Sequence, residues 1–183
     1  LKVLSDQIKE VSIREKWTNI ELVIVNDGST QELNSTTNNP FSLKSTILNL
    51  IVNQVNQIAI TVGLSYIADN NFDYDYIIIM DADGEDKPDD AARLIQASKK
   101  KEIKKIVFAS RAKRNEGFIY IFFYKVYKNL FRLLTGQKIN LGHFSCIPKN
   151  SLKKVLSLPE IWTHFVAAII KSKLPFTTIK CDK

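Results

Sequence analysis

Apolar and polar residues recur with two periods along the chain, and together they predict an α/β protein. Helical spacing runs through 3–16, from 55 to about 68, and from 88 to about 100, where acidic residues at the start and lysines at the end favour a helix. Short apolar or β-branched runs predict strands at 20–25, 46–52, 76–80, 106–110, 141–147 and 176–181. The polar stretch 31–45 predicts a surface loop. This alternation indicates a mostly parallel sheet with helices on its faces.

The strand predicted at 76–80 leads directly into two carboxylates, Asp81 and Asp83. Its uninterrupted apolar run is typical of an interior parallel strand, which is covered on both faces. Ligands of open α/β sheets bind outside the carboxyl ends of the strands, and residues two apart point the same way if the extended geometry persists. Hard oxygen ligands suit Mg²⁺ or Mn²⁺ and hence a phosphate-bearing substrate. The alternative is an acidic turn in which Gly84 makes the bend.

A second acidic turn, Asp27-Gly28-Ser29, follows the strand predicted at 20–25. If the sheet places both turns at one edge, the first would hold a nucleotide and the second a metal–diphosphate group. This pairing is more specific than either turn alone.

Composition narrows the class of protein without choosing a function. The chain has 183 residues, enough for one domain, which we assign to 1–183, and its hydrophobic fraction of 45% is that of a globular protein. The net charge of +7 is compatible with a nucleic acid, an anionic membrane surface or a polyphosphate substrate. Its lysines are scattered and no nucleic-acid motif accompanies them, which favours a solvated surface. Cys146 and Cys181 lack the spacing of a zinc site or a disulfide scaffold.

Five segments in order resemble family 2 glycosyltransferases. LVIVNDGS at 22–29 is similar to their "VDDGS" turn, and 53–64 to their "N-x-G-x-x-x-A-x-x-x-G" helix. DADGEDKP at 81–88 resembles the "DADLQDPPE" motif of the polyprenyl-phosphate branch, which includes dolichol-phosphate-mannose synthase-like enzymes. Ser110-Arg111 and the segment 142–145 match the "SR" and "G-x-F" elements further on. Asn26 and Asn56 depart from the pattern, where the family has Asp and Gly.

The resemblance implies a GT-A fold and inverting sugar transfer from a UDP- or GDP-linked sugar, with Mg²⁺ or Mn²⁺ as cofactor. The residues implied to bind the nucleotide sugar are Asp27, Gly28, Ser29, Asn53, Asp81 and Ala82. The implied metal ligands are Asp81, Asp83 and Glu85, the last standing where the family has Gln. Asp83 also counts as catalytic, together with Arg111 as a phosphate ligand and His164 as a candidate base. For His164 a structural role beside Trp162 and Phe165 stays open.

On the acceptor side, the aromatic and basic stretch 117–132 predicts a helix at a membrane interface, with a core helix as the alternative. The resemblance implies a lipid-phosphate or glycan acceptor, no nucleic acid, and a place at the cytoplasmic face of the membrane. The family pattern would put a further strand before Leu1 and membrane helices after Lys183.

Two other functions compete with this one. An apolar strand followed by Asp-x-Asp-Gly is also the hallmark of haloacid-dehalogenase-type phosphatases, in which Asp81 would be the nucleophile and Asp83 the acid/base. A non-catalytic nucleotide-sugar-binding fragment is the second alternative.

Overall fold

The computed structural model describes residues 1–30, 41–70, 72–100, 104–111 and 141–181, with only the backbone described at 111. The helices are α1 (Lys2–Arg14), α2 (Asn56–Asp69), α3 (Pro88–Lys99), α5 (Lys149–Leu156), the 3₁₀ helix η1 (Pro159–Trp162) and α6 (Phe165–Lys171). The strands are β1 (Glu21–Asn26), β2 (Lys44–Asn49), β3 (Tyr76–Ile79), β4 (Ile106–Arg111), β5 (Leu141–Pro148) and β6 (Phe176–Cys181). Each predicted strand and helix within these ranges is confirmed to within a few residues. The helix predicted at 117–132 and most of the predicted loop at 31–45 lie outside them.

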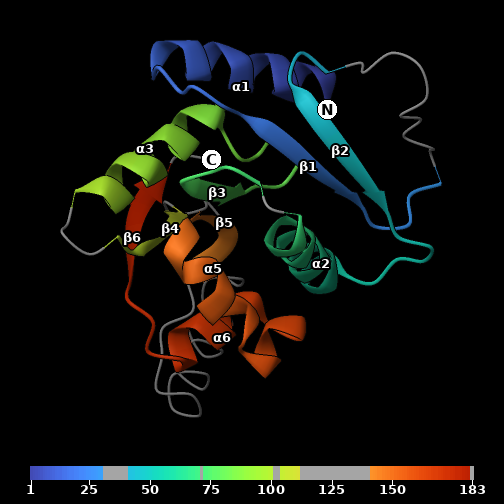
Figure 1. Cartoon of the computed structure of the whole chain (residues 1–183), viewed down its shortest axis with the longest axis vertical. Coiled ribbons are helices and arrows are strands. Elements are labelled where there is room, and N and C mark those ends of the chain that lie inside the picture. The colour runs from blue at the N-terminus through green and yellow to red at the C-terminus, as the bar shows by residue number, and fades with distance from the viewer. Residues whose placement is uncertain (31–40, 71, 101–103, 112–140, 182–183) are drawn as a thin grey trace, which may run out of the picture.

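The described strands form two sheets, one with two parallel strands and one with four strands of mixed direction (Figure 1). β1 and β2 pair in parallel, and the second sheet has the order β3-β5-β4-β6. β5 runs antiparallel to both β3 and β4, whereas β4 and β6 are parallel. The predicted α/β class with flanking helices is confirmed, but the sheets of the described strands are partly mixed instead of mostly parallel, and β3 pairs there with an antiparallel neighbour. An apolar run reports that a strand is covered but carries no information on the direction of its neighbours.

The sheet β3-β5-β4-β6 separates two hydrophobic clusters. Ile106 and Phe108 face α2, α5 and α6, whereas Val107 and Ala109 face α3, as the two-residue period of a strand requires. Phe108 meets Phe165 of α6 edge to face, with ring centroids 6.0 Å apart. Burial of one such side chain is worth about 1.5–3 kcal/mol. These clusters hold the sheet, and with it the carboxyl end of β3, in place.

α3 begins and ends as its sequence predicts. Pro88 stands in the first turn with Asp89 and Asp90, and Lys99 stands in the last. Backbone N–H groups in the first turn of a helix have no intrahelical acceptor, so proline, which has no N–H, loses nothing there. The acidic residues at the start and the lysine at the end interact favourably with the helix dipole. The helix consequently starts directly after the acidic turn and limits that turn to a few residues.

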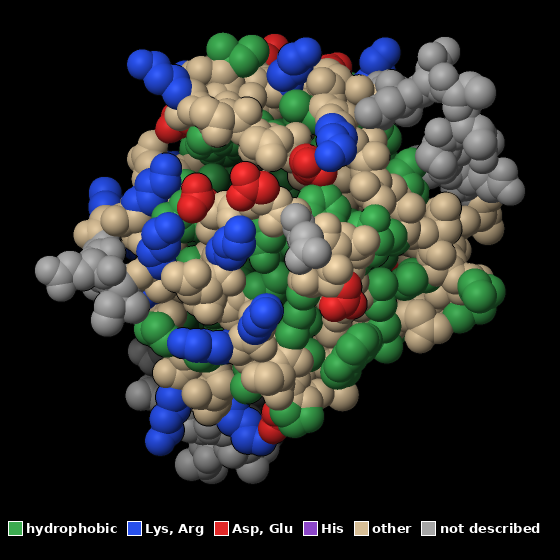
Figure 2. Space-filling model, in the orientation of Figure 1, with side chains coloured by type: hydrophobic (Ala, Val, Ile, Leu, Met, Phe, Trp, Pro, Cys, Tyr) green, Lys and Arg blue, Asp and Glu red, His purple; other side chains and the backbone are tan. Residues whose placement is uncertain are grey.

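Basic side chains lie mainly over the α3 and β6 side of the face in Figure 2, with acidic ones among them. Some of the ion pairs are exposed, such as Lys44 with Glu21 at 2.8 Å. Exposed pairs of this kind contribute little to stability. The surface charge therefore does not explain the fold.

Candidate functional site

The turn after β1 is built around the buried side chain of Asn26. Its amide donates to Asn49 Oδ1 on β2 at 2.9 Å, and its Oδ1 accepts the backbone N–H of Ser29 at 3.2 Å. Gly28 has a φ of +67°, and a Cβ added there would lie 2.7 Å from the carbonyl carbon of Val52 and closer still to Asn53 N. Only glycine permits this approach. The turn is thus pressed against the segment that leads into α2.

The carboxylate of Asp27 is tied to the same segment. Its Oδ1 accepts the backbone N–H of Gln54 at 2.6 Å, and Asn53 Oδ1 accepts that of Val55 at 3.1 Å. Val55, which precedes α2, has a φ of +72°, a conformation that is rare for a β-branched residue. Strain of this kind persists where surrounding contacts enforce it, and it is common at functional sites.

The turn after β3 is held by hydrogen bonds among its own residues. Asp86, which is 2% exposed, accepts the backbone N–H of Asp81 through Oδ2 at 2.9 Å. Asp83 Oδ1 accepts the backbone N–H of Glu85 at 2.8 Å, and Gly84 makes the bend with a φ of +87°. Because β3 ends at Ile79, the extended geometry that would align Asp81 with Asp83 does not persist. Asp83 and Glu85 are exposed, whereas Asp81 is half-buried.

The start of α2 connects the two acidic turns. Asn56, its first residue, directs its amide to Asp81 Oδ1 at 3.4 Å, two residues after Gln54 binds Asp27. The carboxyl ends of β1 and β3 therefore meet the same short stretch of chain. This brings Asp27, Gly28, Asn53 and Asp81 together at one edge of the molecule.

Sequence reasoning missed a junction formed by Gln57. Its amide nitrogen lies 2.8 Å from His143 Nε2 on β5, and its Oε1 accepts the backbone N–H of Phe165 at the start of α6 at 2.8 Å. One side chain thus links three elements next to Asn56. A polar residue in the first turn of a largely apolar helix is the signal that marks such a position.

Two predicted site residues are not brought to the acidic turns by any described contact. Arg111 ends β4 beside Cys181 of β6, and its side chain lies outside the described residues. His164 precedes α6 and its Nδ1 accepts the backbone N–H of Ala167 at 3.3 Å. Nearby, the hydrogen bond from Lys171 lowers the pKa of Glu160 below its ordinary value.

The donor set at the β3 turn suits a divalent cation without forming a complete cage. Among the residues that the structure describes, no three His, Cys, Asp or Glu side chains gather as a preformed metal centre would require. Mg²⁺ commonly binds proteins through one or two carboxylates, with substrate phosphates and water as the other ligands. Asp81 and Asp83, half-buried and exposed respectively, fit that mode.

The family model described as Glycosyl transferase family 2 matches residues 4–161, a range that contains both acidic turns, α2 and the Gln57–His143 contact. The chain belongs to glycosyltransferase family 2. It is thus an enzyme of the class that transfers a sugar from a nucleotide sugar. The alternative prediction of a haloacid-dehalogenase-type phosphatase is not supported. No curated protein matched the sequence.

Membership of family 2 agrees with an α/β structure that is GT-A-like, with partly mixed sheets and flanking helices. It implies a nucleotide-sugar donor for this glycosyltransferase. Within the described ranges, no helix is both long and apolar enough to cross a membrane.

Proposed function

We propose that this glycosyltransferase moves a sugar, with inversion, from a UDP- or GDP-linked sugar to a polyprenyl phosphate, using Mg²⁺ or Mn²⁺. The observation that carries the donor side is the convergence of both acidic turns on 54–56, where Asp27 accepts from Gln54 and Asp81 from Asn56. A nucleoside diphosphate has a base and an anionic diphosphate a few ångströms apart. Two adjacent turns can bind such a ligand, one at the base and the other at the diphosphate.

In this proposal the β1 turn binds the nucleoside. Asp27 accepts from the base while the Gln54 amide holds its carboxylate in place, and Gly28 and Ser29 lie at the nucleoside with Asn53 beside them. Asp81 and Ala82 lie at the ribose. The close approach at Gly28 leaves no space for a side chain between the turn and 52–53. The position of the nucleoside is therefore set by backbone packing as well as by hydrogen bonds.

The β3 turn holds the diphosphate end. Asp81 and Asp83, with Glu85 beside them, would hold the divalent cation, whose chemistry is to neutralise charge on the departing diphosphate. Asp86 keeps the backbone of Asp81 in place from within the protein. Arg111 is proposed to bind a phosphate group, since its planar guanidinium donates two parallel hydrogen bonds to phosphate oxygens.

The choice of a phosphate acceptor is supported by the state of His164, the candidate catalytic base. Nδ1 of His164 accepts a backbone N–H, and a neutral imidazole with that bond carries its proton on Nε2, where a base would need a lone pair. A phosphate acceptor is already ionised near neutral pH, whereas a sugar hydroxyl must lose a proton during transfer. His164 therefore suits an acceptor that needs no deprotonation. With polyprenyl phosphate as that acceptor the reaction takes place at a membrane surface, and the side that we propose is the cytoplasmic one.

The donor side is tested by calorimetric titration of UDP- and GDP-sugars in the presence and absence of Mn²⁺. We expect binding of one nucleotide to require the metal and to weaken at least about tenfold in Asp83→Asn, because the variant loses an anionic ligand. Asp6→Asn, on an exposed part of α1, is the matched control and should bind as the parent does. Metal-independent binding, or equal loss in both variants, would refute the donor assignment.

The acceptor side is tested separately with the donor sugar radiolabelled. Transfer of label to polyprenyl phosphate, and none to the corresponding polyprenol, is the expected result. Transfer to the alcohol or to a glycan would refute the lipid-phosphate acceptor while leaving the donor assignment intact. Tight metal-dependent binding without turnover on any acceptor would instead support the nucleotide-sugar-binding alternative.

A further inference from the structure

Consecutive residues in the first turn of α2 bind two different parts of the candidate site. Asn56 directs its amide to Asp81 Oδ1 in the β3 turn at 3.4 Å. Gln57 contacts His143 on β5 and accepts the backbone N–H of Phe165, which directly follows His164, at 2.8 Å. The first turn of α2 therefore connects the β3 turn with the start of α6, although no described contact joins the two directly.

The side-chain amide of Gln57 is held at both ends in one orientation. Its Oε1 faces the N–H of Phe165, which can only donate, so its nitrogen must face His143. That nitrogen lies 2.8 Å from Nε2 and 3.4 Å from Nδ1 of the His143 ring. An amide turned the other way would place two donors against each other at Phe165. Gln57 thus holds β5 and α6 at a fixed separation.

The register of the sheet places His143 on the side of the β3 turn. β5 is antiparallel to β3, and Ser145 pairs with Ile79, the last residue of β3. His143 lies two residues further along β5 toward that turn, and it is half-buried. Because side chains alternate along a strand, His143 shares the face of Ser145, and the contact with Gln57 is on this face. The ring that Gln57 holds is therefore close to the turn that contains Asp81.

A second contact on the same side of α2 binds the segment ahead of α6. Thr61, one turn after Gln57, is fully buried, and its hydroxyl lies 3.1 Å from the carbonyl oxygen of Ile161 in η1. Ile161 and Phe165 are themselves 0% exposed. The segment 159–165 is thus bound to α2 at two points, by Gln57 in the first turn and by Thr61 in the next.

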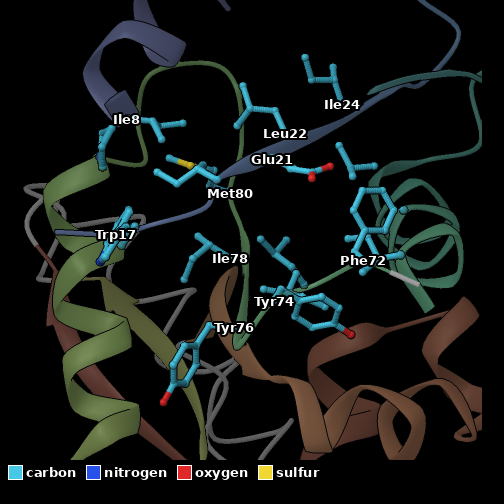
Figure 3. Close-up of a pocket in the computed structure, with 18 of the residues that line it drawn as sticks. Ile8, Trp17, Glu21, Leu22, Ile24, Phe72, Tyr74, Tyr76, Ile78 and Met80 are labelled. Atoms are coloured by element: carbon cyan, nitrogen blue, oxygen red, sulfur yellow. The ribbon is translucent and has the colours of Figure 1, made fainter. Parts of the chain in front are cut away.

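Another side of α2 borders an apolar cavity of about 670 Å³ between β1 and β3. The strand residues that line it include Leu22, Ile24, Ile78 and Met80 (Figure 3). α2 adds apolar residues such as Ile60 to the lining, but neither Gln57 nor Thr61. Apolar contacts are not directional, whereas hydrogen bonds require a defined geometry. The rotation of α2 about its axis, and with it the direction of Asn56, therefore depends on Gln57 and Thr61.

We propose that Gln57 is a positioning residue for sugar transfer. It fixes the turn of α2 that binds Asp81 relative to His143 and to the segment that contains His164. Misplacement of reacting groups by about 1 Å can lower a rate about 100-fold, so loss of a bond that sets this separation lowers turnover. This role rests on the proposed donor site, and it does not depend on which acceptor takes the sugar.

The test measures release of nucleoside diphosphate from the nucleotide sugar by the full chain with Mn²⁺, which counts transfer to any acceptor, water included. Gln57→Leu removes both contacts of the amide and should lower kcat at least about tenfold. The dissociation constant of the donor should change less than about twofold, because this residue makes no bond to the donor turns. Those turns keep their own hydrogen bonds, from Gln54 N–H to Asp27 and from Asp81 N–H to Asp86.

Gln57→Glu and Thr61→Val separate positioning from general stability. Gln57→Glu keeps an acceptor for the N–H of Phe165 and should recover at least part of the rate. Thr61→Val is the matched control, because it removes a bond from the same helix to the same segment and leaves the Gln57 amide intact. It should lower the midpoint of urea unfolding but keep kcat within about twofold of the parent. Equal loss of turnover in Thr61→Val and Gln57→Leu would overturn the proposal, and so would unchanged turnover in Gln57→Leu.

A measurement without turnover covers the case in which the chain binds the donor and does not transfer the sugar. Saturation with the nucleotide sugar and Mg²⁺ should shift the backbone amide NMR signals of 164–167 in the parent and in Thr61→Val. In Gln57→Leu the same signals should move less than about half as far, because the connection through α2 is lost. No shift in the parent, or an equal shift in Gln57→Leu, would overturn the positioning role. Absence of metal-dependent binding in the parent would instead refute the donor site, and this role with it.

Discussion

Replacement of Gly28 by Ala tests the close approach that joins the β1 turn to the start of α2. The turn has a φ of +67° at this residue, and an added Cβ would lie 2.7 Å from Val52 C and nearer still to Asn53 N. Both neighbours are backbone atoms, so no side-chain rotation relieves the overlap. The turn or the segment 52–55 must move.

The cost follows from two separate terms. A non-glycine residue in the left-handed region costs about 1–2 kcal/mol. Overpacking against backbone adds about 1–3 kcal/mol. Gly28→Ala should therefore lower the free energy of unfolding by about 2–5 kcal/mol. Because the movement displaces the Gln54 amide from Asp27, nucleotide binding should weaken as well.

Alanine substitutions at two other glycines separate the cost of the left-handed backbone conformation from the cost of overpacking. Gly84 also has a positive φ, +87°, but nothing lies within 4 Å of an added Cβ, so Gly84→Ala should cost only about 1–2 kcal/mol. At Gly142 an added Cβ likewise meets nothing and φ lies outside the left-handed region, so Gly142→Ala should be close to neutral. Urea unfolding followed by circular dichroism measures all three. If Gly28→Ala costs no more than Gly84→Ala, the close approach does not exist.

Three further predictions concern the surrounding framework. Gln57→Leu removes the amide that bridges β5 and α6, and should lower the free energy of unfolding in urea by about 1–3 kcal/mol; an unchanged midpoint would contradict the bridge. Asp86→Ala removes the acceptor of the Asp81 N–H, so we expect a similar loss together with faster hydrogen exchange at that amide; unchanged exchange would show that Asp86 does not hold the turn. Burial raises the pKa of the Cys146 thiol to about 12, so in a Cys181→Ser background it should stay unreactive toward a disulfide reagent at pH 8 until urea unfolds the chain. The unfolded thiol loses its proton near its ordinary pKa of 9.0 while the folded one keeps it, so this group should lower stability as pH rises from about 9 toward 12; rapid labelling of the native protein would refute the burial.

Local patterns of the sequence were sufficient to predict where the helices and strands lie and which chemical groups the turns carry. Pro88 and the acids that follow it predict where α3 begins, because capping and dipole effects act within one helical turn. Gly28 and Gly84 predict bends, and both have positive φ values. The family motifs that enclose these turns predicted membership of glycosyltransferase family 2, which the comparison confirms.

Strand direction, strand order and contacts between distant side chains were decided by the tertiary structure alone. The run at 76–80 is equally apolar beside a parallel or an antiparallel neighbour, so it could not reveal that β5 pairs with β3 in the opposite direction. No local rule places Gln57 against His143 or Asn56 against Asp81, since these contacts form between elements far apart in sequence. The sequence thus determined which groups the site contains, because residue chemistry and short-range geometry are local properties. Packing decided which of them meet, because the pairing of strands and the docking of helices depend on the whole chain.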